Sequence, residues 1–414
     1  MKSLFAMKNR LAANWVLAFI AVIVLSAYTS AEAQAHYRHL RQFSGGEDGS
    51  VPLSGLLADH NTLYGTTASG GDPLCHCGVV FKLKLTQGEW KQRVLYSFTG
   101  VPDGASPWGK LVEDSAGNLY GTTYAGGAFG LGTVFKLDPD TGQETVLYSF
   151  TGPPDGQNPQ AGLVLDSAGN LYGTTLNGGA CQYPQGCGVV FKVDTAGNET
   201  IVHTFTGGYD GAFPGYGALV RDPGGNLYGV TNLQGAGGVG VVFKINVENE
   251  TAKALYSFDP ANKPGDGSLP LGGLLRLPGN IFIGTTTQGG TSGWGTVFKL
   301  AGGTETVLYN FTKGADGGYP QSDLVRDLQG RLFGTTLYGG DNTDCPPYGC
   351  GTVFKLSPAG VETVLHRFTG SEGANPWAGV IKGPGNNSYY GTTTTGGHFD
   401  QGVVFEMDLP PAGK

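Results

Sequence analysis

Apolar and aromatic residues are gathered in four short runs, and these runs return in the same order along nearly the whole chain. In one copy the runs are residues 162–166, 170–175, 188–193 and 199–205. Each run is short and rich in β-branched and aromatic residues, a pattern typical of β-strands. The polar segment Asp-Ser-Ala-Gly-Asn at 166–170 separates the first two runs and predicts a tight hairpin. Every copy therefore predicts a small sheet of four antiparallel strands.

Two landmarks fix the number of copies. The glycine of the Tyr-Gly-Thr-Thr phrase recurs at positions 65, 121, 173, 229, 284, 334 and 391, so successive copies are 50 to 57 residues apart. The phenylalanine of the Val-Phe-Lys phrase recurs at 81, 135, 191, 243, 298, 354 and 405. Four-stranded antiparallel sheets repeated radially make a β-propeller. We predict an all-β fold in which residues 36–409 form one seven-bladed propeller, with seven repeats of about 54 residues and a short tail at 410–414.

The two ends of the repeat region complement each other. The last copy stops after its third strand phrase at 403–407, whereas a fourth-strand phrase stands alone at 37–43. We therefore expect the N-terminal strand to complete the last blade as its outermost strand. This arrangement closes the ring without a covalent link and leaves no long inner sheet edge open to other chains.

Three long phrases carry a resemblance to a known family. Gly-Asn-Leu-Tyr-Gly-Thr-Thr at 117–123, Gly-Thr-Val-Phe-Lys-Leu at 132–137 and Glu-Thr-Val-Leu-Tyr-Ser-Phe at 144–150 resemble the GloVer tandem repeat, a bacterial extracellular repeat family. The resemblance covers residues 37–408, although the fourth and fifth copies depart from the Tyr-Gly-Thr-Thr phrase. It implies the repeat architecture and secretion. It implies no defined reaction.

The N-terminal 35 residues differ from the repeats. Lys2, Lys8 and Arg10 precede an apolar run at 15–27, and small-residue cleavage sites follow at 31–35. This order predicts a secretory signal peptide over residues 1–35. The alternative is an uncleaved membrane anchor, but a span needs about 20 apolar residues. We expect a secreted protein, periplasmic or extracellular, with no membrane span after cleavage.

Composition narrows the class of partner. The chain contains 73 glycines and 23 prolines, and only 14% of its residues are charged, which fits a turn-rich β protein. The formal net charge is −8, and the repeats hold no cluster of basic residues. Because a nucleic-acid partner requires a basic patch to neutralise phosphates, we expect none. We expect the protein to be a monomer.

Six cysteines lie in three copies that are not consecutive, two in each copy. The second cysteine always directly precedes the glycine that opens the third strand. The repeat therefore favours local disulfides, which fit a secreted chain. The pairs are Cys181 with Cys187, Cys345 with Cys350, and Cys75 with Cys77. The last pair has only one intervening residue, so the bond would be strained, and a redox or metal role with His76 is the alternative.

An acidic residue precedes the glycine of the turn between neighbouring copies. These residues are Asp48, Asp103, Asp155, Asp210, Asp266 and Asp316, with Glu372 in the last copy. Turn chemistry explains the pattern, because aspartate bonds its own backbone and glycine takes the left-handed conformation. The alternative is calcium held by one or more of these loops, although no EF-hand motif is present. We expect no other cofactor.

Positions at which the copies differ are the best candidates for ligand contacts. The residue after the turn proline opens the innermost strand at the rim of the central channel, and it varies around the ring: Leu53, Trp108, Gln160, Gly215, Leu271, Gln321 and Trp377. Aromatic loop residues, among them Tyr124 and Trp294, are expected on the same face. An aromatic, mildly acidic concavity suits stacking against a glycan or gripping a peptide. We predict ligand contacts by Trp108, Trp377, Gln160, Gln321, Tyr124 and Trp294; packing between blades is the alternative for the aromatic residues.

The repeats show no asymmetric set of acid, base and nucleophile and no catalytic motif. We therefore expect a secreted, non-enzymatic binding or scaffolding propeller that recognises a glycan or an extracellular protein on its loop-rich face. One alternative is a polysaccharide-active lyase or hydrolase with its site at the central channel. Another is a structural cell-surface repeat protein. Fold alone does not separate these classes, because one fold hosts many functions.

Overall fold

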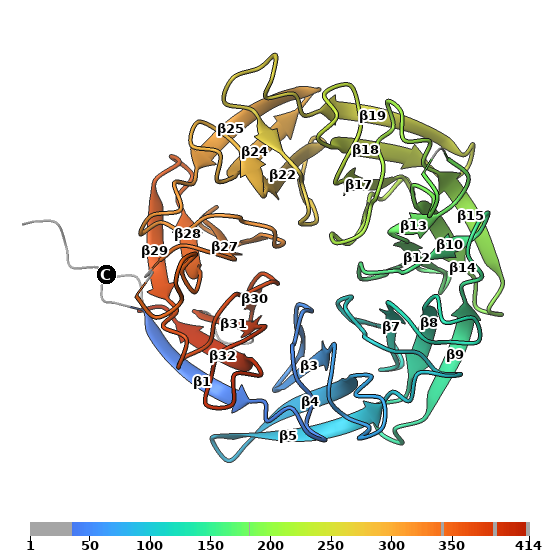
Figure 1. The fold of residues 1–414 in the computed structure, drawn as a ribbon, viewed down its shortest axis with the longest axis vertical. Helices are drawn as coiled ribbons and strands as arrows, with labels where there is room; N and C mark the ends of the chain where they lie inside the picture. Colours follow the sequence, from blue (N-terminus) through green and yellow to red (C-terminus); the bar gives the residue numbers. More distant parts are fainter. Residues whose placement is uncertain (1–34, 182, 341–342, 384–386, 411–414) are drawn as a thin grey trace, which may run out of the picture.

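The computed structural model describes residues 35–181, 183–340, 343–383 and 387–410. Within these ranges the chain forms seven four-stranded antiparallel sheets, arranged as blades around a central axis (Figure 1). The predicted seven-bladed propeller is confirmed. The predicted signal peptide, residues 1–35, lies outside the described part of the chain except for Ala35. The described residues contain no helix long and apolar enough to cross a membrane.

Each blade runs from an innermost to an outermost strand. The innermost strands are β2 (Leu57–Asp59), β6 (Val112–Glu113), β11 (Val164–Leu165), β16 (Val220–Arg221), β21 (Leu275–Leu277), β26 (Val325–Arg326) and β30 (Ile381–Lys382). The second strands are β3 (Thr62–Thr67), β7 (Leu119–Thr123), β12 (Leu171–Thr174), β17 (Leu227–Thr231), β22 (Ile281–Thr286), β27 (Leu332–Thr336) and β31 (Ser388–Thr393). The third strands are β4 (Val79–Thr86), β8 (Thr133–Leu137), β14 (Val189–Val193), β18 (Val241–Asn246), β24 (Thr296–Ala301), β28 (Thr352–Leu356) and β32 (Val403–Asp408).

The outermost strands are β5 (Glu89–Ser97), β9 (Glu144–Ser149), β15 (Glu199–Thr204), β19 (Thr251–Ser257), β25 (Thr304–Asn310), β29 (Glu362–Arg367) and, for the seventh blade, β1 (His36–Gln42). Two small extra ladders join β10 (Gly156–Gln157) to β13 (Asn177–Gly178) and β20 (Gly267–Ser268) to β23 (Gln288–Gly289) in the loops.

The N-terminal strand closes the ring as predicted. β1 pairs antiparallel with β32, from His36 opposite Asp408 to Gln42 opposite Val403. Figure 1 shows β1, in blue, lying along the outside of the red seventh blade. Side chains add to the seam, because the Tyr37 ring stacks on His366 of the sixth blade with centroids 4.0 Å apart. The chain ends are thus joined by a sheet ladder and by packing.

The hydrophobic core is a ring of seven clusters, each shared by two neighbouring blades. At every junction a phenylalanine that follows an outermost strand packs edge-on against the Val-Phe-Lys phenylalanine of the next blade. The pairs are Phe43–Phe81, Phe98–Phe135, Phe150–Phe191, Phe205–Phe243, Phe258–Phe298, Phe311–Phe354 and Phe368–Phe405, with centroids 5.0 to 5.3 Å apart. The two phenylalanines of the repeat therefore link blades rather than the strands of one blade.

The threonine pair, which every repeat except the fourth carries, also holds neighbouring blades together. At five junctions the first hydroxyl donates to a backbone carbonyl that opens the next blade, as from Thr122 to Ala161 at 3.0 Å. The second hydroxyl donates to a carbonyl two residues on, as from Thr123 to Ala125 at 2.9 Å. Some second threonines also pair across strands, as Thr123 does with Thr133 at 2.9 Å. These hydroxyls serve the scaffold.

The glycine of the Tyr-Gly-Thr-Thr phrase makes room for the core phenylalanine opposite it. Gly121 pairs with Phe135, and a Cβ added at Gly121 would lie 2.6 Å from the Phe135 ring and 2.9 Å from Leu111. Gly121→Ala should therefore lower the free energy of unfolding by about 2 kcal/mol through overpacking. Chemical denaturation measures this change, and Gly46→Ala, whose added Cβ would meet only Ser44 at 3.6 Å, is the matched control. Equal stability of the two variants would contradict this explanation of the glycine.

Candidate functional site

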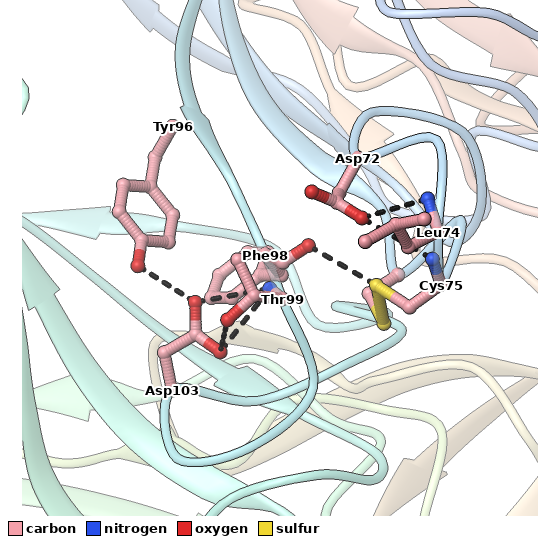
Figure 2. The surroundings of a disulfide bond; sticks show 8 residues. Asp72, Leu74, Cys75, Tyr96, Phe98, Thr99 and Asp103 are labelled. Atoms are coloured by element: carbon pink, nitrogen blue, oxygen red, sulfur yellow. Dashed lines mark hydrogen bonds between the residues drawn. A yellow bond between two sulfur atoms is a disulfide. The ribbon is translucent and has the colours of Figure 1, made fainter.

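In each Asp-Gly turn the aspartate carboxylate accepts hydrogen bonds from residues of the same turn; we call this arrangement the aspartate clasp. In Figure 2 the Asp103 carboxylate faces Thr99 and Tyr96. It accepts hydrogen bonds from the Tyr96 hydroxyl at 2.7 Å and from the Thr99 backbone N–H at 3.0 Å. The other five aspartates accept equivalent bonds within their own turns. Among the described residues no group of three or more His, Cys, Asp or Glu side chains is placed to hold a metal ion. The aspartate clasp explains why these turns carry an aspartate: its carboxylate satisfies donors of the turn.

All three cysteine pairs form disulfides within single loops: Cys75–Cys77, Cys181–Cys187 and Cys345–Cys350, with Cα atoms 5.2, 5.9 and 5.2 Å apart. In the first of these loops, Asp72 accepts from the backbone N–H groups of Leu74 and Cys75 at 2.8 and 3.2 Å (Figure 2). The disulfides lie in the loops that lead into a third strand. They therefore fix loop shape, and none of the six cysteines lines the central cavity.

A cavity of about 90 Å³ lies where the innermost strands meet at the centre of the ring. Its narrowness follows from backbone contact between neighbouring blades. A Cβ at Gly109 would lie 2.5 Å from the Ala161 carbonyl oxygen, and one at Gly379 would lie 2.2 Å from that of Asp323. Glycine at these positions lets the innermost segments touch, which leaves a small cavity instead of an open bore.

Aromatic side chains form the walls of this cavity. Trp108 stacks on Tyr124 with centroids 4.6 Å apart and an angle of 9° between the rings. Trp377, from the seventh blade, lies 6.0 Å from Tyr216 of the fourth blade. Figure 1 shows that these two blades lie on opposite sides of the ring, so the contact spans the central axis. Trp108, Trp377 and Tyr216 line the cavity, and Tyr124 supports Trp108 from behind.

Three polar atoms at the cavity are buried without a hydrogen-bond partner among the described residues. They are Nε1 of Trp108, Oε1 of Gln160 and Nε2 of Gln321. The two glutamines are 5% and 7% exposed. A buried polar group without a partner costs about 1 to 3 kcal/mol. Residues that line the cavity thus carry two donors and one acceptor that no described residue satisfies.

The cavity carries little charge. Its described lining has one cationic and one anionic residue, Lys110 and Asp323, and Asp323 accepts a hydrogen bond from the Gly273 N–H at 2.6 Å. Burial, and secondarily the nearby Tyr124, raises the pKa of Tyr216 above its usual 10.0. The Tyr216 hydroxyl is therefore protonated at neutral pH and can donate. The site as a whole suits an uncharged polar molecule.

The structure brings together four of the six residues predicted to contact a ligand: Trp108, Gln160, Gln321 and Trp377. Tyr124 stands behind the wall, and Trp294 lies apart, in a cluster with Tyr319. The sequence reasoning missed Tyr216. A signal for it was present in the sequence. Gly215 is the one rim position occupied by glycine, so the next residue, Tyr216, provides the side chain at that point of the channel.

Fold and site together define a seven-bladed propeller with an aromatic, polar-lined cavity on its axis. The sequence profile of the Gloeobacter/Verrucomicrobia repeat matches residues 25–220 and 215–413, and the chain belongs to this family. The resemblance read from the repeat phrases is thereby confirmed. A comparison with curated proteins finds no match.

Solved structures share the architecture at low sequence identity. An oligogalacturonate lyase from Vibrio parahaemolyticus is similar, with 12% identity, a TM-score of 0.55, and coverage of 93% of this chain and 96% of that one. A puromycin-hydrolyzing peptidase from Mycobacterium tuberculosis is similar as well, with 14% identity, a TM-score of 0.52, and coverage of 91% of this chain and 55% of that one. At such identities the likeness concerns the fold alone, because one fold hosts unrelated functions.

Proposed function

We propose that this propeller is a secreted, non-enzymatic binding protein whose central cavity recognises an uncharged glycan. The observation that carries the proposal is the coincidence of aromatic walls with three buried, unpartnered polar atoms, on Trp108, Gln160 and Gln321. A sugar ring offers an apolar C–H face for stacking and hydroxyl groups that both donate and accept.

The size of the cavity indicates which part of a glycan would enter. Pockets that enclose a small ligand measure about 300 to 1,000 Å³, and this cavity has about 90 Å³. We infer that it takes a terminal sugar or an exposed ring edge, while the rest of the glycan stays on the loop face. Three disulfides support a place outside the cytoplasm, because such bonds persist in oxidising compartments.

Binding fits the cavity better than glycoside hydrolysis does. Most glycoside hydrolases use two carboxyl groups on either side of the scissile bond. The described lining supplies one, on Asp323, which already accepts a backbone hydrogen bond. We therefore assign ligand recognition to the cavity. The similarity to the lyase concerns the fold alone.

The proposal predicts that the aromatic walls are needed for binding. A glycan array should first identify an uncharged ligand, whose affinity is then measured by calorimetry. Trp377→Ala and Trp108→Ala should each weaken binding at least about tenfold, a loss of about 1.4 kcal/mol, because each removes a stacking surface at the cavity.

Tyr209→Ala is the matched control, since Tyr209 is an aromatic residue that is 81% exposed and does not line the cavity. Its affinity should equal that of the wild type. Unchanged affinity in both tryptophan variants would refute the site. Capture of a protein partner with no glycan bound would refute the ligand class.

A further inference from the structure

A second aromatic cluster lies apart from the central cavity, at the junction of the fifth and sixth blades. It consists of Trp294, Tyr319, Tyr338 and Tyr348 together with Lys313, and we call it the Lys313 cluster. Neighbouring rings are in contact, with centroids 5.2 to 5.4 Å apart. The Lys313 ammonium sits between the two ends of this row, 4.3 Å from the Trp294 ring centroid and 4.5 Å from that of Tyr348.

Lys313 occupies a backbone position that glycine fills in other blades. Its φ is +61°, in the left-handed region, and its N–H donates to the Gly317 carbonyl. Five other copies place glycine here, with φ between +74° and +91°: Gly45, Gly100, Gly152, Gly207 and Gly370. A lysine is strained in this conformation, whereas a glycine is not. The sixth blade thus carries a costly side chain where the scaffold needs none.

The ammonium of Lys313 is held by rings and not by an acid. No ion pair between Lys313 and a carboxylate is found in the described part of the chain. Cation–π contact orients an ammonium without using its N–H donors. Tyr348 is 51% exposed and lies in the loop closed by the Cys345–Cys350 disulfide, so part of its side chain meets solvent on a loop that the disulfide constrains.

These features select the charge of a ligand. The gap between Trp294 and Tyr348 already holds a cation, so a second cation would be repelled. An anion would meet three free N–H donors. Aromatic surface beside that ammonium suits an acid carried on a ring with an apolar C–H face more than an extended acidic peptide.

We propose that the Lys313 cluster is a second ligand site, which binds an acidic saccharide by packing a sugar ring against the exposed part of Tyr348 and pairing its carboxylate with the Lys313 ammonium, which Trp294 helps to position. The site is separate from the central cavity, and its ligand differs from the cavity's in charge. One segment supplies both sites, because Tyr319 lies two residues before Gln321.

The test uses a hexasaccharide of galacturonic acid, its fully methyl-esterified form and a hexaglutamate peptide as probes, with affinity measured by calorimetry on the full secreted chain. The acidic hexasaccharide should bind the wild type, and the ester and the peptide should bind at least about tenfold more weakly. Lys313→Gly should weaken hexasaccharide binding at least about tenfold and raise the melting temperature, because it restores the glycine used by other blades. Lys313→Arg should retain affinity within about threefold.

Further variants separate the two sites. Trp294→Leu, which introduces the residue that the second blade has at Leu131, should also weaken the acidic probe. Trp377→Ala alters only the central cavity. It should leave the affinity for the acidic hexasaccharide unchanged, whether or not the cavity binds a glycan. Full affinity in Lys313→Gly, equal binding of hexaglutamate, or no binding of the hexasaccharide to the wild type would each overturn the proposal.

Discussion

Deletion of residues 36–43 is expected to lower the melting temperature by about 10 °C or more and to open the ring. The deletion removes β1, the outermost strand of the seventh blade, and leaves β32 as an exposed edge. It also removes Phe43, which is fully buried and packs on Phe81 of the first blade. The Tyr37 contact with His366 of the sixth blade is lost as well.

The size of this effect follows from its largest part. Loss of a buried phenylalanine side chain alone costs about 3 to 5 kcal/mol. Each kcal/mol shifts the melting temperature of a large domain by about 2 °C, so Phe43 and the lost ladder together give about 10 °C. Unpaired strand edges also recruit other chains, so the deleted protein should associate in size-exclusion chromatography.

A permuted chain is the control for this deletion. His36 lies opposite Asp408 in the ladder, so a short loop can connect them. The second blade supplies that loop, because residues 138–143 join its third strand β8 to its outermost strand β9. In the permuted chain a copy of this loop follows Asp408 and leads into residues 36–43. This chain has the same strands with a covalent closure, and its melting temperature should return to that of the wild type or exceed it. A deletion variant as stable as the wild type would contradict closure by β1.

Removal of four half-buried carboxylates is expected to stabilise the protein at alkaline pH. Glu144, Glu199, Glu305 and Glu362 occupy the same place in the outermost strands of four blades. Burial, and secondarily the negative charge of the turn aspartate that faces each one, raises the pKa of each carboxyl to about 7. One oxygen of each is buried without a hydrogen-bond partner among the described residues.

The direction of the pH dependence follows from the raised pKa. The ordinary value of 4.5 applies to the unfolded chain, and the folded value is about 7. Well below pH 4.5, at about pH 3, the carboxyls are neutral in both states and cost nothing. As the pH rises from 4.5 to 7 the unfolded chain ionises first, so stability is lost across this window. Because solvent screens partly exposed charges, we expect about 1 kcal/mol per site.

The variant with all four glutamates replaced by glutamine should therefore gain about 4 kcal/mol over the wild type at pH 8 and almost nothing at about pH 3. Urea denaturation across this pH range measures the difference in the free energy of unfolding between variant and wild type. The other titrating groups are the same in both proteins, so their contributions cancel. The first blade already has this arrangement, because Gln92 stands at the equivalent position and donates to the Asp48 carbonyl at 2.9 Å. A gain that is the same at every pH would contradict the assigned ionisation.

The repeat made most of the fold predictable. Hydrophobic runs, the count of seven and the displaced fourth strand at 37–43 specified the blades and their closure, because each is a periodic or terminal feature of the sequence. The bulge between third and fourth strands was not predictable. It shifts the register next to the core phenylalanine in every blade, as between Val134 and Phe135. Because the residues around it are apolar on both sides of the bulge, the sequence shows no break in the pattern of apolar and polar positions.

The site was predictable only in part. Comparison of equivalent positions found Trp108, Gln160, Gln321 and Trp377, because a propeller places the start of every innermost strand at its axis. It could not find the contact of Tyr216 with Trp377, which depends on side-chain direction across the ring. It also grouped Trp294 with the channel, whereas that loop turns toward Lys313 at the rim of the next blade.

The most direct test of the account is a crystal structure of the protein with the uncharged glycan that the array identifies. We predict a sugar ring in the central cavity, in contact with Trp108 and Trp377, with its hydroxyl groups on Gln160 Oε1 and Gln321 Nε2. A glycan bound elsewhere, with these atoms contacted only by water, would contradict the assignment of the cavity as the recognition site.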